Sequence, residues 1–108
     1  MTVKELCEKT GFKVVCLPEP EREVSGCYCG DLLSWVMGRA SSGQVWITIM
    51  SNINIVAVAT LCDTAVIILS ENVALEENVV NTAEQRGVNI VSAPMPTFEA
   101  AKAIADLV

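Results

Sequence analysis

The sequence contains no histidine among its 108 residues, and only 5% of them are aromatic. It therefore lacks the side chain that most often serves as a general base or a metal ligand near neutral pH. The small number of aromatic rings also leaves little surface on which nucleic-acid bases could stack. Both absences argue against a histidine-based active site and against a base-stacking surface.

Basic side chains are few and scattered. The chain has 7 lysines and arginines against 13 acidic residues, which gives a formal net charge of −6, and no two basic residues are adjacent. Nucleic-acid binding draws most of its affinity from neutralised phosphates and normally needs a concentrated basic surface. We expect no nucleic-acid partner.

No apolar run is long enough to cross a bilayer, which takes about 20 consecutive residues. The best candidate, residues 55–62, is bounded by Asn54 and Asp63. Residues 1–11 mix charged and apolar side chains and do not resemble a secretory leader. Together with an odd number of cysteines, five in all, this predicts a cytoplasmic protein with reduced thiols and no membrane partner.

Apolar residues are abundant: they make up 52% of the chain, and the mean hydropathy is +0.46. A chain of this length is expected to form one domain, residues 1–108, around one core. So high an apolar fraction is typical of a sheet covered on both faces or of a subunit interface. We expect both features, and therefore a homodimer.

Hydrophobic periodicity predicts helices and strands in alternation. Residues 3–10 are helical and end at Gly11, whereas residues 12–17 and 24–28 are extended. From residue 31 onward the order becomes helix, strand, helix, strand, helix, strand, helix, with strands expected over residues 45–49, 65–69 and 88–91. Residues 53–62 could also form a strand, but the length of the run favours a helix. This order predicts an α/β fold with a short, mostly parallel sheet flanked by helices.

Several segments carry a family resemblance. They are GDLLSWVMGRA, VWITI, NIVAVATL, AVIIL and GVNIVSAPMPTFEAAKAI, and the most specific pieces are residues 30–33 and residues 97–100. Over residues 26–108 the sequence resembles the DRTGG domain family, which is similar in fold to the N-terminal domain of HPr kinase/phosphorylase. The resemblance implies an accessory regulatory or ligand-sensing module, often oligomeric, with no active site and no cofactor.

The chain departs from the family at the residues that give the family its name. Where the family shows Asp-Arg after a strand, this chain has Ser51-Asn52. Where the family shows Thr-Gly-Gly, it has Ser70-Glu71-Asn72. A ligand shared by other family members therefore does not carry over by sequence alone.

Small polar residues follow the predicted strands. In open α/β sheets, ligands gather at the carboxyl ends of parallel strands, near a reversal of strand order. The residues expected there, as a putative ligand site, are Asp31, Ser51, Asn52, Ser70, Glu71, Asn72, Ser92 and Thr97. The alternative is that Asp31, Ser51 and Thr97 only cap helices. Because Glu71 is present and these loops hold no basic residue, a nucleoside triphosphate is disfavoured unless a metal accompanies it.

The Cys27-Tyr28-Cys29 segment could begin an iron–sulfur or zinc site, but such sites need about four ligands. The other cysteines lie in apolar patterns, where cysteine usually packs as a small hydrophobe. Packing is therefore the favoured role, and we predict no metal site. Cys29 precedes a predicted helix, yet Asp31 should raise its pKa by charge repulsion, which argues against a nucleophile.

These observations predict a non-catalytic regulatory or small-ligand-sensing module, active as a homodimer. One alternative is an interaction subunit that docks on a larger enzyme through an apolar face. Another is a metal or redox protein that uses Cys27 and Cys29.

Overall fold

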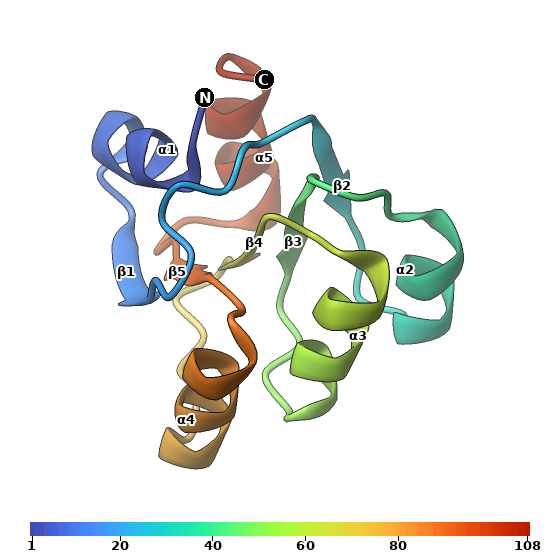
Figure 1. Cartoon of the computed structure of the whole chain (residues 1–108). Coiled ribbons are helices and arrows are strands. Elements are labelled where there is room, and N and C mark those ends of the chain that lie inside the picture. The colour runs from blue at the N-terminus through green and yellow to red at the C-terminus, as the bar shows by residue number, and fades with distance from the viewer.

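The computed structural model covers residues 1–108 and contains five helices and five strands (Figure 1). In chain order they are α1 (Val3–Thr10), β1 (Lys13–Cys16), β2 (Cys27–Cys29), α2 (Leu33–Arg39), β3 (Val45–Thr48), α3 (Asn54–Cys62), β4 (Val66–Leu69), α4 (Glu77–Arg86), β5 (Ile90–Ser92) and α5 (Thr97–Ala105). None of the helices is long and apolar enough to cross a membrane.

The strands form one sheet in the order β1-β5-β4-β3-β2. Strands β2, β3, β4 and β5 pair in parallel with their sequence neighbours, and β1 is antiparallel to β5 at the edge. This confirms the predicted α/β fold with a mostly parallel sheet. Because consecutive parallel strands are adjacent, their order never reverses.

Helices cover both faces of the sheet. Helices α1 and α5 lie on one face, while α2, α3 and α4 lie on the other (Figure 1). Successive side chains of a strand point to opposite faces, so Val45 and Ile47 pack toward α1 and α5, whereas Trp46 packs toward the opposite layer. Strands β3 and β4 are buried along their whole length, which accounts for much of the apolar composition.

Two of the predicted helix ends are confirmed. Gly11 and Gly87 follow α1 and α4 with φ angles of 70° and 71°, in the left-handed region that glycine adopts without a steric cost. At its other end α1 has a capping box, in which Thr2 and Glu5 accept hydrogen bonds from each other's backbone. These local signals set the limits of the two helices.

The predicted helix caps at Asp31, Ser51 and Thr97 are wrong. The residues at the N-cap positions of α2, α3 and α5 are Leu32, Ile53 and Pro96. None of these three helices has a side-chain hydrogen bond at its N-cap. The polar side chains have other partners or none, so their roles must be read from tertiary structure.

The last strand is Ile90–Ser92, two residues later at its start than expected. The Val88 N–H still bonds to the Ala83 carbonyl of α4. The Asn89 carboxamide accepts a hydrogen bond from the Glu19 N–H at 2.9 Å and donates to the carbonyls of Glu19 and Ala65 at 2.7 and 3.0 Å. The shift places Ser92 within the sheet.

Residues 17–26 connect the two edge strands, β1 and β2, and so cross the full width of the sheet. The segment is fastened at several points besides Asn89. Arg22 donates to a carboxylate oxygen of Asp63 and to its backbone carbonyl, both at 2.8 Å, and Ser42 donates to the second carboxylate oxygen. Beside Arg22, the pKa of Asp63 is lowered. We call residues 17–26 the strap.

Candidate ligand pocket at the strand ends

Asp31 joins the carboxyl ends of β2 and β3. One carboxylate oxygen accepts the Thr48 hydroxyl at 2.9 Å and the Ile49 N–H at 3.0 Å. Thr48 is fully buried, and its hydroxyl also accepts the Met50 N–H at 3.1 Å. The carboxylate oxygen is therefore occupied by the protein itself, and Asp31 holds two strand ends together.

Ser70 and Thr97 close the space between β4 and β5. Their hydroxyl oxygens lie 2.7 Å apart, and Ser70 is fully buried. The two loops are also joined by backbone, because the Glu71 N–H bonds to the Met95 carbonyl at 2.8 Å. The chain leaves β4 toward one face and β5 toward the other, so a crevice would be expected here. The hydrogen bonds between the two loops close this space.

Glu71 and Asn72 both have left-handed backbones, with φ angles of 59° and 56°. Asparagine tolerates this conformation better than most residues, whereas for glutamate it is strained. These two positions are where the DRTGG pattern has its two glycines, and glycine adopts such angles freely. The turn thus keeps the shape that the glycines of the pattern favour, with different residues.

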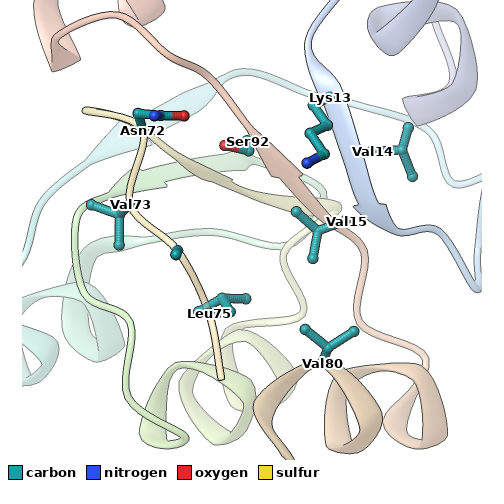
Figure 2. Close-up of a pocket in the computed structure, with 9 residues that line it drawn as sticks. Lys13, Val14, Val15, Asn72, Val73, Leu75, Val80 and Ser92 are labelled. Atoms are coloured by element: carbon teal, nitrogen blue, oxygen red, sulfur yellow. The ribbon is translucent and has the colours of Figure 1, made fainter. Parts of the chain in front are cut away.

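Beyond this turn, residues 72–75 form one wall of a pocket of about 460 Å³. The other walls are residues 13–15 of β1, Val80 of α4, and Ser92 at the end of β5 (Figure 2). Most of the lining is aliphatic. We call this the β1–β5 pocket.

The polar groups of the β1–β5 pocket are not used by the protein. Lys13 and Ser92 are direct cross-strand partners, and Lys13 forms neither of the chain's two salt bridges, which join Met1 to Glu23 and Arg22 to Asp63. Figure 2 shows Lys13 and Asn72 on either side of Ser92. Neither the Ser92 hydroxyl nor the Asn72 carboxamide has a hydrogen-bond partner in the chain. Such groups are available to a bound molecule.

A second pocket, of about 350 Å³, lies on the other side of residues 72–75. It is lined by Ser51, Asn52 and Ile53 before α3, and by Ala74, Glu76, Asn78 and Val79 around the start of α4. Asn52 is already engaged, since its side-chain oxygen accepts the Asn54 N–H at 2.9 Å. Glu76 makes this pocket unfavourable for anions.

The predicted site residues therefore separate into groups. Ser51 and Asn52 share the second pocket, and Asn72 and Ser92 share the β1–β5 pocket. Asp31, Ser70 and Thr97 are paired within the protein, and Glu71 is an exposed turn residue. Lys13 was missed. The loops lack basic residues as expected, but β1 supplies one through its antiparallel pairing with β5. No local sequence pattern predicts that pairing, so Lys13 could not be found from the sequence.

Cys29, the last residue of β2, has a pKa lowered to about 7. The main cause is Cys27, whose thiol can donate a hydrogen bond to the Cys29 thiolate; burial and the charge of Asp31 oppose this more weakly. The same interaction, together with burial, raises the pKa of Cys27. Asp31 raises the pKa of Cys29, as predicted, but Cys27, which the sequence reasoning did not consider, lowers it by more. No group of three or more cysteine or carboxylate side chains is placed to hold a metal ion.

The fold and the geometry at the strand ends define a small α/β domain with an open pocket that is lined mainly by aliphatic side chains. The model of the DRTGG domain family matches residues 5–107. The chain belongs to this family, and the match extends further toward the N-terminus than the range of residues 26–108 over which the sequence resembles the family most. No curated protein matches the sequence significantly.

A solved structure shares the fold. It holds the CBS and DRTGG domains of the regulatory region of Clostridium perfringens pyrophosphatase, complexed with the activator diadenosine tetraphosphate. The TM-score is 0.73 at 12% sequence identity, and the likeness covers 95% of this chain and 45% of that one. This chain thus spans about half the length of its structural neighbour.

Proposed function

We propose that this chain is a regulatory domain that senses a small ligand in the β1–β5 pocket and has no catalytic activity. The observation that carries the proposal is the set of unused polar groups of Lys13, Asn72 and Ser92 beside an aliphatic wall. Ligand sites of this kind are mostly apolar with a few polar groups that fix orientation. The regulatory setting of the DRTGG neighbour supports the same role.

We do not extend the neighbour's ligand to this chain. A tetraphosphate carries several negative charges, whereas Lys13 is the one charged residue in the lining of the β1–β5 pocket. Glu71 and Glu76 flank the wall of residues 72–75 and would repel a polyanion. The ligand of this pocket should be smaller and less charged.

The test is a small-molecule screen followed by amide NMR on the full chain. A ligand should shift the amide signals of Lys13, Asn72 and Ser92, and Ala74→Trp should abolish the shifts by filling the pocket. Ala57→Trp is the matched control, because Ala57 is also an exposed alanine but lies on α3, away from the pocket lining. A broad screen without any binder, or binding unaffected by Ala74→Trp, would contradict the proposal.

We further propose that the chain forms a homodimer through α2. Leu32, Trp35 and Met37 are 58%, 54% and 49% exposed, next to the short edge strand β2. Large apolar side chains exposed in this number along one short segment are a feature of interaction sites. Light scattering should give twice the chain mass of 11.6 kDa, and Trp35→Glu should give a monomer while Leu61→Glu does not. A monomer at every concentration tested would favour the alternative of a subunit that docks on a larger enzyme.

A cytoplasmic location is proposed from the thiols. All five cysteines are free, as expected for a protein kept in a reducing compartment. Thiol titration of denatured, freshly isolated protein should return five groups per chain. We propose no metal or redox role for Cys27 and Cys29, because no third ligand joins the pair.

A further inference from the structure

We propose that the β1–β5 pocket selects a monocarboxylate with a short aliphatic body. This inference rests on the proposed ligand-sensing function and names the chemical class of the ligand. It follows from three features of the lining: its charge, its unsatisfied hydrogen-bonding groups and its apolar wall.

The charge of the lining is a single positive one. Lys13 is the only ionisable residue among the nine that line the pocket, and its ammonium group has no carboxylate partner in the chain. One ammonium group can neutralise one negative charge. A carboxylate satisfies it fully, whereas the second charge of a phosphate monoester would enter an aliphatic pocket without a counter-ion, which is unfavourable.

Ser92 supplies the second feature. The residue is 9% exposed, and its hydroxyl has no hydrogen-bond partner in the chain. Other buried polar side chains of the sheet are paired: Thr48 with Asp31, Ser70 with Thr97, and Asn89 with the strap. The Ser92 hydroxyl differs from these because it is open to the pocket and bonds to no other group of the chain. A ligand oxygen at this position could form a hydrogen bond with it.

Lys13 and Ser92 stand side by side because they are cross-strand partners in the antiparallel β1–β5 pair. Partners in such a pair project to the same face with their Cβ atoms about 5 Å apart. The two oxygens of one carboxylate can therefore contact an ammonium and a hydroxyl together. Ala74 and Leu75 lie in the opposite wall, and their backbone N–H groups have no acceptor in the chain.

The rest of the pocket is aliphatic. Val15, Val73, Leu75 and Val80 contribute to the lining, and Figure 2 shows Val15, Leu75 and Val80 grouped on one side of Ser92. The volume of about 460 Å³ is near the lower end for small-molecule sites. A short aliphatic body can pack against this wall.

The experiment compares three probes of matched shape by NMR titration of the full chain. They are 4-methylpentanoate, its neutral amide, and isopentyl phosphate. We expect the carboxylate to bind at least tenfold more tightly than either of the others. Lys13→Met should remove that tenfold preference while leaving amide binding unchanged, and Ser92→Ala should weaken carboxylate binding several-fold. Lys102→Met on α5 is the control, and it should change nothing.

Equal binding of the carboxylate and the amide, or tighter binding of the phosphate, would overturn the inference on ligand class. In either case, a compound whose binding is lost in the Ala74→Trp variant would still support the proposed sensing function. If none of the probes binds while another compound from the screen does so in an Ala74→Trp-sensitive way, the class is wrong and the pocket is right. If no compound binds there at all, both proposals fail.

Discussion

Two places along the border formed by the carboxyl ends of the parallel strands differ in how their polar groups are used. At the β2–β3 end, made by Cys29, Asp31 and Thr48, each polar side chain interacts with a neighbour in the protein. At the β5–β1 end, the polar groups of Ser92 and Lys13 have no partner and line a pocket. Both places lie beyond strand termini, where ligands collect in α/β sheets. Position alone therefore does not distinguish the two ends, whereas unused hydrogen-bonding capacity does.

The largest expected effect is at the β2–β3 end. Replacing Cys27 with alanine removes the group that lowers the pKa of Cys29 to about 7, while burial and Asp31 continue to raise it. The pH midpoint of Cys29 alkylation should rise by about two units, toward the ordinary thiol value. Mass spectrometry of iodoacetamide labelling across pH measures this, and Cys62→Ala should leave the midpoint unchanged. An unmoved midpoint in the Cys27 variant would show that the thiols do not interact.

Asp31→Ala should be the most destabilising of the substitutions considered at the strand ends. It leaves the buried Thr48 hydroxyl and the Ile49 N–H without their acceptor. Hydrogen bonds to charged groups are worth more than neutral ones, so the free energy of unfolding should fall by about 2 kcal/mol. Urea denaturation measures the loss. Asp106→Ala, at a carboxylate without a side-chain hydrogen bond, should cost far less, and equal losses would remove Asp31 from its structural role.

Ser70→Ala tests the Ser70–Thr97 pair between the ends of β4 and β5. The change removes the 2.7 Å contact with Thr97 and leaves the Thr97 hydroxyl without that partner. Loss of a neutral hydrogen bond in a buried place should lower the free energy of unfolding by about 1 kcal/mol. Thr97→Val should cost a similar amount, and the double variant should cost less than the two losses added together. Additive losses would mean that the two hydroxyls do not act as a pair.

Glu71→Gly should act in the opposite direction. It removes the strain of a left-handed glutamate at φ 59°, and glycine adds flexibility to the unfolded chain that cancels part of the gain. The net result should be a stabilisation of about 0.5 kcal/mol. Thermal unfolding would detect it, with Glu99→Gly in α5 as a control that must destabilise. A loss in the Glu71 variant would show that its side chain contributes a contact of its own.

Ser92→Ala should have the smallest effect on stability. No partner is left unsatisfied, so the free energy of unfolding should change by less than about 0.5 kcal/mol. It differs from Ser70→Ala only in position, and both serines are at least nine-tenths buried. Equal losses in the two variants would contradict the distinction between the two kinds of strand end.

Much of the fold follows from local sequence. The apolar runs at residues 45–49 and 65–69 predict strands buried on both faces, and Gly11 and Gly87 mark two helix ends. The site could be predicted only in part, because the partners of Asp31 lie 17 and 18 residues away. Local pattern suggested a cap there. Lys13 carries no local sign of function, since its place in the pocket depends on the pairing of β1 with a strand near the other end of the sequence.

The strap gives the molecule a direct covalent route from one edge of the sheet to the other. Only ten residues separate the pocket strand β1 from β2, and they are fixed to the body by Asn89 and by the Arg22–Asp63 pair. A shift of β1 on ligand binding would therefore displace the strap and, through it, β2, beside which the apolar side chains of α2 are exposed. Occupancy at one border of the sheet could in this way alter what the far border contacts.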